Sequence, residues 1–316
     1  MKKIFFYLLL FSLILSANQP YKKITTNNFI TSLDLYKNTL YVSTDKGEVE
    51  IYNTNTNKKI GSIKLDSIND YFGNKLLPKV FHTHTLDGKN ILIVSQDNNS
   101  GSKISIYNNK KMYEVKPNNQ TSMISKAYFI DSDKILFGSL SNEISLYSLS
   151  QKKMIWHIQP SEAVFSDLIF DENTAISTTE GGIIYLIDLE NGNIIKSLEG
   201  ANFDNVYMLA SAKNIILSAG RDKTCGIYDK VSGNFKRLET DFLSYAVGIS
   251  KDSTLGAVSL NENNDILIFN TTTLSRIDIL KGGNALPNTI IFIDNENIIS
   301  GFDSKSILFW KIGDKK

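Results

Sequence analysis

The sequence has few of the residues that build covalent cross-links and cofactor sites. It contains one cysteine, Cys225, so an intrachain disulfide is impossible and a covalent Cys-x-x-Cys-His haem site is absent. Cys225 falls within an expected strand, where a free thiol usually behaves as a small buried hydrophobe. Neither a Gly-x-Ser-x-Gly nucleophile elbow nor a glycine-rich phosphate loop occurs. The sequence therefore indicates no familiar catalytic centre, and we expect neither enzymatic activity nor a resident cofactor.

An excess of charge of one sign is also lacking. Lysine and arginine together number 34, and aspartate and glutamate together number 33. Such a balance argues against a nucleic-acid binder that works by neutralising phosphates. It also argues against a polybasic contact with a membrane surface. We therefore expect no nucleic-acid partner.

The first 17 residues have the pattern of a secretory signal peptide. The basic start Met1-Lys2-Lys3 is followed by an apolar run over 4–15 and then by Ser16-Ala17-Asn18. The run is shorter than the ~20 residues that a membrane-spanning helix needs, and an uncleaved N-terminal anchor is the alternative interpretation. We predict a signal peptide at 1–17 and a mature domain at 18–316. The prediction implies a periplasmic location without a stable membrane anchor after cleavage.

The remaining chain repeats at a nearly fixed spacing. Seven short segments of similar pattern each contain an aromatic or apolar key residue, and the steps between these residues are 55, 40, 40, 41, 41 and 41. A period of ~40–45 residues with four short strands per unit is typical of β-propellers. We therefore predict an all-β, seven-bladed propeller. The key residues are Tyr52, Tyr107, Tyr147, Ile187, Tyr228, Phe269 and Trp310.

One unit shows a family resemblance. Residues 218–229 run as a serine-containing strand end, a polar turn and a strand that ends in Tyr228-Asp229, which resembles the second half of a WD40 repeat. The Gly-His pair of that family is missing before every first strand, and only Trp310 fills a tryptophan place. The family's His–Ser/Thr–Asp–Trp hydrogen-bond set is thus incomplete in every blade, with Ser218 and Asp222 as its best remnants. The chain is similar to degenerate WD40-like propellers.

The two ends of the repeat array indicate how the ring closes. The seventh unit supplies strands near 288–293, 297–301 and 305–312 but no fourth strand, while a spare strand at 21–26 precedes the first unit. A spare strand at the outer edge of the last blade would remove two open edges, which are a pairing hazard. The WD40 resemblance implies the same closure. We expect residues 18–316 to form one domain and the protein to be a monomer.

The first step of the repeat contains an insertion of about 14 residues, Asp66–Lys79. It links the outer strand of the first blade to the inner strand of the second, on the face where the central channel opens. Its apolar content exceeds what a solvated loop needs, and long loops on rigid scaffolds often carry function. A loop packed on itself is the alternative. The predicted partner-binding residues are Asp66, Asp70, Tyr71, Phe72, Leu76 and Leu77.

Two histidines follow the insertion, at places where inner strands carry apolar residues. His82 and His84 are two apart in a strand, so both rings are expected on one face near the channel mouth. Such a pair could ligate a metal or haem, or titrate, with Asp66 or Asp70 as an acid. His157 is expected in an outer strand, too far away to join them. A ligand site is one interpretation, buried hydrogen-bonded histidines are the other, and no metal is assigned.

Two functions fit these observations. The first is an exported, non-enzymatic propeller that docks onto, or helps to assemble, another periplasmic or envelope protein. The length, leader and degenerate repeats are similar to the exported WD40-like accessory proteins of periplasmic nitrate reductase, the NapL family, which implies a redox enzyme as partner. Repeat proteins of outer-membrane assembly are a nearby alternative. The second function is a propeller enzyme or a metal- or haem-binding protein that uses His82 and His84.

Overall fold

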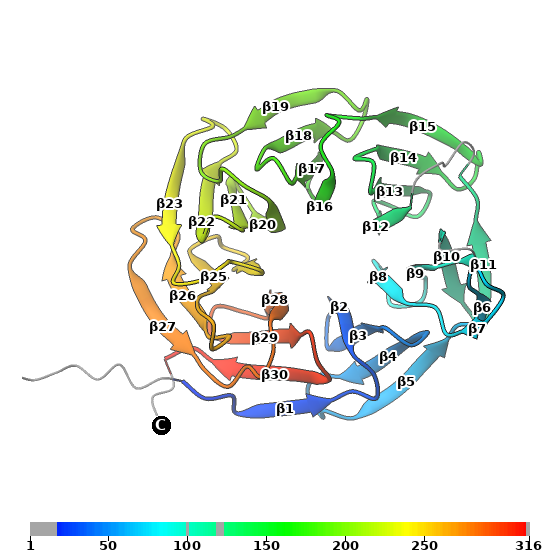
Figure 1. The fold of residues 1–316 in the computed structure, drawn as a ribbon, viewed down its shortest axis with the longest axis horizontal. Coiled ribbons are helices and arrows are strands. Elements are labelled where there is room, and N and C mark those ends of the chain that lie inside the picture. Colours follow the sequence, from blue (N-terminus) through cyan, green and yellow to red (C-terminus); the bar gives the residue numbers. More distant parts are fainter. Residues whose placement is uncertain (1–17, 99–100, 118–122, 314–316) are drawn as a thin grey trace, which may run out of the picture.

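The computed structural model describes residues 18–98, 101–117 and 123–313, which form a ring of seven four-stranded antiparallel sheets (Figure 1). Each sheet is a blade with its inner strand at the centre of the ring and its outer strand on the rim. The predicted all-β, seven-bladed propeller is confirmed. The described residues contain no helix long and apolar enough to cross a membrane. The signal peptide predicted at 1–17 lies outside the described residues.

The strands of the first four blades follow one another along the chain. Blade 1 consists of β2 (Ile30–Tyr36), β3 (Thr39–Thr44), β4 (Glu48–Asn53) and β5 (Lys59–Lys64). Blade 2 consists of β8 (Val80–His84), β9 (Ile91–Gln96), β10 (Ser102–Asn108) and β11 (Lys111–Val115). Blade 3 consists of β12 (Ile124–Phe129), β13 (Lys134–Ser139), β14 (Ile144–Ser148) and β15 (Lys153–Ile158). Blade 4 consists of β16 (Phe165–Asp171), β17 (Thr174–Thr179), β18 (Ile184–Asp188) and β19 (Ile194–Leu198).

The last three blades complete the ring. Blade 5 consists of β20 (Val206–Ala212), β21 (Ile215–Gly220), β22 (Thr224–Asp229) and β23 (Phe235–Glu239). Blade 6 consists of β24 (Val247–Ile249), β25 (Leu255–Ser259), β26 (Ile266–Asn270) and β27 (Arg276–Leu280). Blade 7 consists of β28 (Pro287–Phe292), β29 (Asn297–Phe302), β30 (Ser306–Lys311) and β1 (Lys22–Thr25).

The middle strands of each blade are buried on both faces because every blade packs between two neighbours. β13 and β21 each have five consecutive buried residues, whereas β19 on the rim has only one. Strands covered on both sides read as continuous apolar runs, and strands covered on one side alternate. The hydrophobic clusters accordingly join adjacent blades: one combines Leu136 and Leu146 of blade 3 with Leu168 and Ile187 of blade 4. The core is therefore a series of layers between blades.

The ring closes as the sequence predicts. β1 pairs antiparallel with β30, from Lys22 opposite Phe309 to Thr25 opposite Ser306. The predicted spare strand, 21–26, extends one residue beyond β1 at each end, and both extra residues still donate backbone hydrogen bonds to blade 7. Ahead of β1, the amide of Asn18 donates to the carbonyl of Ile279 in blade 6 at 3.1 Å. The N-terminal segment thus joins the last two blades.

Six inner strands share a feature that the sequence does not reveal, a β-bulge close to their first residue. A bulge leaves one residue unpaired and re-aims the side chains that follow it. The first residue after the bulge occupies the same place in each blade and lines the central cavity. These six residues are Ser32, His82, Lys126, Asp167, Met208 and Thr289.

Candidate functional site

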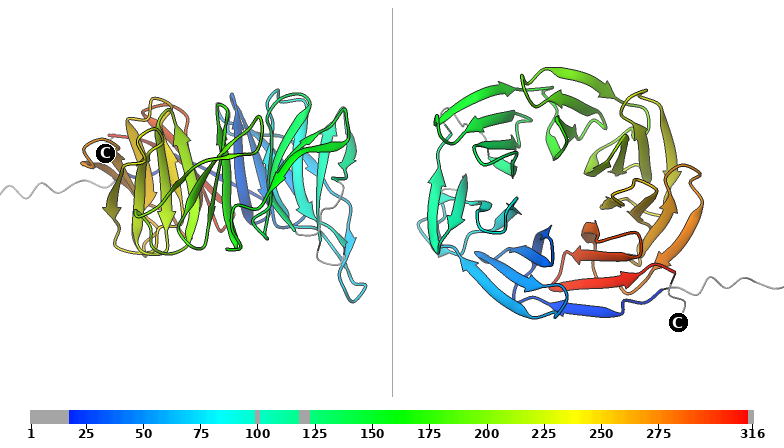
Figure 2. Two further views of the ribbon diagram at one scale, coloured as in Figure 1. Left: turned by 90° about the horizontal axis from the view of Figure 1, so that it is seen from above. Right: turned by 180° about the vertical axis from the view of Figure 1, so that it is seen from behind.

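The insertion forms a small hairpin of two strands, β6 (Ile68–Asn69) and β7 (Lys75–Leu76). It lies on the rim beside β11 and projects from the disc, as the two views of Figure 2 show. The amide of Asn69 donates to Oδ1 of Asn98 at 2.9 Å, which ties the hairpin to blade 2. The insertion was expected in the link from the outer strand of blade 1 to the inner strand of blade 2, on the face where the channel opens. The hairpin lies in that link, between β5 and β8, and stays at the rim rather than beside the channel mouth.

Asp70 fixes the turn of the hairpin. Its Oδ1 accepts hydrogen bonds from the amides of Phe72 and Asn74 at 2.9 and 2.8 Å, and its Oδ2 accepts one from Nδ2 of Asn74 at 3.0 Å. These bonds, that of the Asn74 side chain first, hold the pKa of the Asp70 carboxyl below its ordinary value. Gly73 supplies the left-handed residue of the turn, at φ 83°. Asp70 therefore serves the turn, and Asp66 is exposed ahead of β6.

Two aromatic rings stand exposed at the hairpin tip. Tyr71 is 80% exposed and Phe72 is 85% exposed, and their ring centroids are 5.7 Å apart in an edge-to-face arrangement. Ile68, only 4% exposed, is the buried apolar residue of the hairpin strands. Of the other predicted contacts, Leu77 is half-exposed and Leu76 is half-buried. The structure thus brings Tyr71 and Phe72 together and leaves Leu76 and Leu77 at the base of the hairpin.

The two histidines lie in the channel wall and contact blade 3. His82 is buried, with Nδ1 3.0 Å from the carbonyl oxygen of Ala127, whereas Nδ1 of His84 accepts a hydrogen bond from the amide of Phe129 at 3.1 Å. Both rings meet Tyr128 edge-on, at centroid distances of 4.7 and 5.1 Å. Burial lowers the pKa of His82 well below its ordinary value and that of His84 to about 4. Both rings are therefore neutral near pH 7.

Because both rings are neutral, their hydrogen-bond partners show which nitrogen of each ring carries the proton. Nδ1 of His82 faces a carbonyl oxygen, so it carries the proton and donates, which leaves a lone pair on Nε2. Nδ1 of His84 accepts from an amide, so its proton is on Nε2. His157 lies in the outer strand β15, where it was expected, with Nδ1 2.8 Å from Oγ of Ser145. Within the described ranges, no three His, Cys, Asp or Glu residues are grouped to hold a metal ion.

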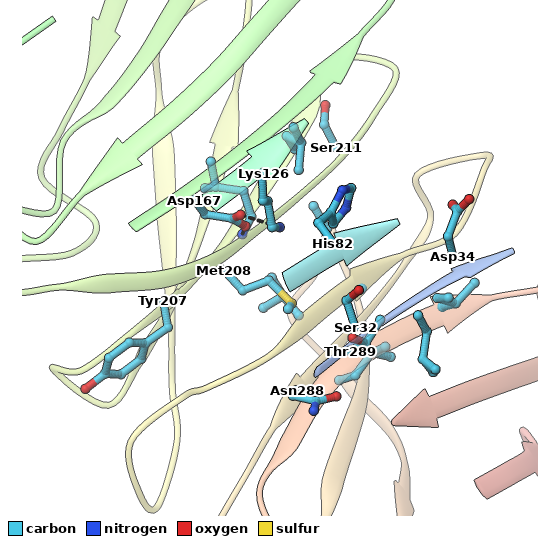
Figure 3. Close-up of a pocket in the computed structure, with 18 of the residues that line it drawn as sticks. Ser32, Asp34, His82, Lys126, Asp167, Tyr207, Met208, Ser211, Asn288 and Thr289 are labelled. Carbon is cyan, nitrogen blue, oxygen red and sulfur yellow. Dashed lines mark hydrogen bonds and ion pairs between the residues drawn. The ribbon is translucent and has the colours of Figure 1, made fainter. Parts of the chain in front are cut away.

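An ion pair next to His82 was missed from the sequence. Lys126 of blade 3 pairs with Asp167 of blade 4 across the wall of the cavity (Figure 3). Burial alone would lower the pKa of Lys126, but the Asp167 carboxylate and Tyr128 raise it above its ordinary value. The other oxygen of Asp167 accepts from the amide of Leu209 at 2.8 Å. The two residues are 41 apart, one repeat period, and each stands just after the bulge of its inner strand.

Asp34 is a second acid in the wall of the cavity. Its Oδ2 accepts a hydrogen bond from the amide of Thr85 at 3.1 Å. Protein encloses the carboxyl, and this burial raises its pKa to about 7, although backbone hydrogen bonds from Thr85 and Leu35 act in the opposite direction. Unlike Asp167, Asp34 forms no ion pair with any residue that the structure describes. The cavity therefore contains one neutralised acid and one acid without a cation.

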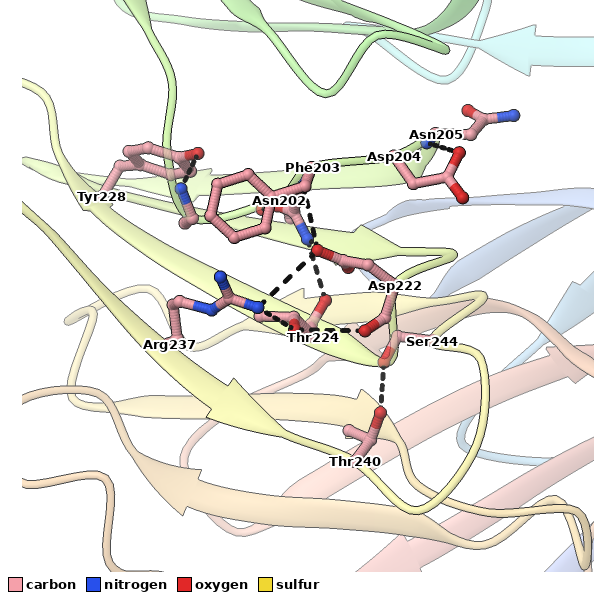
Figure 4. Close-up of polar contacts among 12 residues, drawn as sticks. Asn202, Phe203, Asp204, Asn205, Asp222, Thr224, Tyr228, Arg237, Thr240 and Ser244 are labelled. Carbon is pink, nitrogen blue, oxygen red and sulfur yellow. Dashed lines mark hydrogen bonds and ion pairs between the residues drawn. The ribbon is translucent and has the colours of Figure 1, made fainter.

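Blade 5 is held by a side-chain network centred on Asn202 (Figure 4). Nδ2 of Asn202 donates to Oδ1 of Asp222 at 3.1 Å and to the carbonyl of Thr224 at 3.1 Å, and its Oδ1 accepts from Oγ of Ser218 at 2.5 Å. The other oxygen of Asp222 accepts from the amide of Phe203 at 3.0 Å. Asn202 stands in the link before β20, where the resemblance expects a histidine. Ser218 and Asp222 were predicted as remnants of the WD40 hydrogen-bond set, but Asn202, which joins them, was not predicted.

No family model matches the chain, and no curated protein matches it. The propeller fold by itself assigns no function, because one fold carries many. The features that bear on function are therefore the hairpin tip, the channel wall and the network of blade 5.

Proposed function

We propose that the protein is an exported, non-enzymatic docking or accessory factor that binds another periplasmic or envelope protein through the tip of the β6–β7 hairpin. The observation that carries this proposal is the exposed Tyr71–Phe72 pair on a turn fixed by Asp70. Aromatic anchors supply much of the binding energy of protein interfaces. A turn that is already ordered loses little conformational entropy on binding, so its contacts contribute more fully to affinity.

The exposed pair buries little surface within the fold. A loop packed on itself would bury its aromatic rings, because each ring removes on the order of 150–250 Å² from water when it is covered. Here Ile68 is buried and both rings of the tip remain in solvent. The hairpin is also the one departure from a repeat that otherwise advances by 40 or 41 residues. An insertion that adds exposed aromatics to a regular ring supports a contact with something outside it.

The leader pattern and the repeats guide the choice of partner. The signal-like pattern of residues 1–17 supports a periplasmic location, and the degenerate WD40-like repeats are similar to the NapL accessory proteins. A periplasmic nitrate reductase system is therefore the first partner to test. Balanced charge fits a partner held by apolar and hydrogen-bonded contacts rather than by phosphate neutralisation.

The experiment uses tagged mature protein and periplasmic extract, followed by affinity measurement with the purified partner. The test variant is Tyr71→Ser/Phe72→Ser. The control is Val231→Ser, which removes an apolar side chain that is 70% exposed in the turn between β22 and β23. We expect a single dominant redox or envelope protein to bind the wild type and the control, with at least tenfold weaker binding to the test variant. Equal binding to all three would rule out the hairpin as the docking site.

A second candidate function is a metal- or haem-binding protein or enzyme that works in the channel. The observation that favours it is the lone pair of His82 Nε2 in the cavity wall. It predicts that purified protein carries stoichiometric metal or a chromophore, and that His82→Ala and His84→Ala each remove it. A colourless preparation without metal would count against this candidate and leave the docking proposal untouched.

A further inference from the structure

The central cavity has the size and the contrasting walls of a small-molecule site. Its volume is about 510 Å³, and all seven inner strands contribute to its lining. Cavities of ~300–1,000 Å³ are typical of ligand sites. Blades 1 to 4 contribute the charged side chains of the described lining and His82, together with apolar ones such as Leu33 and Phe170, whereas blades 5 to 7 contribute mainly apolar side chains. The polar residues of blades 1 to 4 include Ser32, Asp34, His82, Lys126 and Asp167, and the apolar residues of blades 5 to 7 include Met208, Ala210, Ile249 and Ile291.

A wider hollow connects this cavity to the face where the outer-to-inner links lie. That hollow measures about 700 Å³ and shares Thr31, Phe81, Lys126 and Met208 with the cavity below it. Four of the residues that it adds, Phe29, Asp45, Lys79 and Asp303, lie in or beside links and turns of that face. The cavity therefore has a vestibule through which a small solute can enter.

The polar wall is rich in hydrogen-bond acceptors. Lys126 and Asp167 neutralise each other, and Nδ1 of His82 is engaged by the carbonyl of Ala127. Two acceptors remain, the lone pair on Nε2 of His82 and the carboxyl of Asp34. No cation among the described residues pairs with that carboxyl. Oγ of Ser32, which also lines the cavity (Figure 3), is buried without a hydrogen-bond partner among the described residues. An unmet buried hydroxyl costs free energy, so a partner from outside the chain is favoured there.

We propose that the channel binds a small hydroxylated organic cation. Its charged nitrogen would donate to the Asp34 carboxylate, its hydroxyl groups would donate to His82 Nε2 and exchange a hydrogen bond with Ser32, and its carbon atoms would lie against Met208 and Ile291. An anion is disfavoured because the one cation in the wall, Lys126, is already paired. A neutral polyol keeps the hydroxyl contacts but lacks the charge-assisted bond. This site is independent of the hairpin and does not rest on the docking function.

Three probes of the same shape separate charge from hydrogen bonding: N-methylglucamine, sorbitol and gluconate, titrated calorimetrically into the mature protein at pH 8. We expect N-methylglucamine to bind at least tenfold more tightly than sorbitol, and gluconate to bind most weakly. The variant Asp34→Asn should weaken N-methylglucamine binding by about tenfold to a hundredfold, since a hydrogen bond to a charged group is worth ~1.5–3 kcal/mol, and should leave sorbitol unchanged. Asp66→Asn, with the same loss of charge outside the cavity, should change nothing.

A second readout on the wild-type protein guards against a variant that fails to fold. With methyl-labelled methionine, the resonance of Met208 in the cavity should shift on addition of N-methylglucamine, while that of Met112 on the rim strand β11 should not. Equal affinity for all three probes, or unchanged binding in Asp34→Asn, would overturn the proposal. The proposal would also be overturned if 20 mM N-methylglucamine neither bound nor shifted the Met208 resonance. This concentration is on the order of ten times the weakest dissociation constant of interest, so such a result would mean that only water fills the cavity.

Discussion

Blades 2 and 5 have the same four strands but differ in how their entering link is held. In blade 5, Asn202 bonds the link to Asp222 and Ser218, so the link is short and closed onto its own sheet. In blade 2, the link is the β6–β7 hairpin, which is braced by its own turn and touches the blade through Asn69. A link locked by buried side chains has no room for an insertion. Blade 5, whose link is held by these bonds, has no insertion, whereas blade 2, whose link is held differently, carries one.

The largest effect is expected from Asn202→Ala, which removes the lock. The change deletes three hydrogen bonds and leaves Ser218 and Asp222 partly unsatisfied, each at a cost of ~1–3 kcal/mol. We expect the free energy of unfolding in urea to fall by about 3 kcal/mol. Asn98→Ala, which removes the side-chain acceptor of the Asn69 amide, should change it by less than about 0.5 kcal/mol because this bond is exposed. Similar losses from both would erase the proposed difference between the two links.

The next effect concerns acid stability in blade 2. Burial lowers the pKa of His84 to about 4, whereas an unfolded histidine titrates near ~6.5. Below ~6.5 the unfolded state binds more protons than the folded state, so stability is lost as the pH falls. His84→Gln should remove about 2 kcal/mol of the decline between pH 7 and pH 5. Urea unfolding at both pH values tests this, and an identical decline in the variant would show that His84 is charged in the fold.

A smaller effect is expected from loosening the turn of the hairpin. Asp70→Ala removes the acceptor of the Phe72 and Asn74 amides, so the tip must be ordered when the partner binds. An ordering cost of about 1 kcal/mol corresponds to a roughly fivefold loss of affinity for the captured partner. Glu262→Ala, which removes an exposed carboxylate in the turn between β25 and β26, is the matched control. If both variants bind like the wild type, the turn does not preorganise the site.

The smallest effect is on stability at the hairpin tip itself. Tyr71→Ser/Phe72→Ser replaces two largely exposed rings that contact each other, so the midpoint of thermal unfolding should move by less than about 2 °C. A binding defect in this variant can then be ascribed to the surface. A large drop in the midpoint would instead show that the rings support the fold, and blade 2 would no longer differ from blade 5 in that respect.

The fold was largely predictable because its information is local and repeated. The spacing of the key residues fixes seven units, and the missing fourth strand of the last unit predicts the place of β1. Residues that meet across blades were harder to foresee. Lys126 and Asp167 stand one period apart, a regularity that indicates equivalent places but not an ion pair. Asn202 takes the place of an expected histidine, and that substitution becomes visible only when its partners are known.

The candidate site was predictable in composition rather than in position. The apolar excess of the insertion led to the prediction that Tyr71 and Phe72 contact a partner, and the structure leaves both rings exposed, but the direction in which a link leaves the ring depends on contacts such as that of Asn69 with Asn98. The bulges that aim His82 and Lys126 into the cavity leave no mark in composition, because bulging depends on the register between two strands.

The closure of the ring by β1 also sets an order of events during synthesis. β1 is made before any blade, yet its partner β30 is the last strand to appear, more than 280 residues later along the chain. Closing so long a loop is entropically costly, although the cost grows only with the logarithm of its length. Until then blade 7 lacks its outer strand and β1 lacks a sheet, so two unpaired edges coexist. The nascent chain therefore passes through an open arc, and this state is where the protein is most exposed to chaperones and to aggregation.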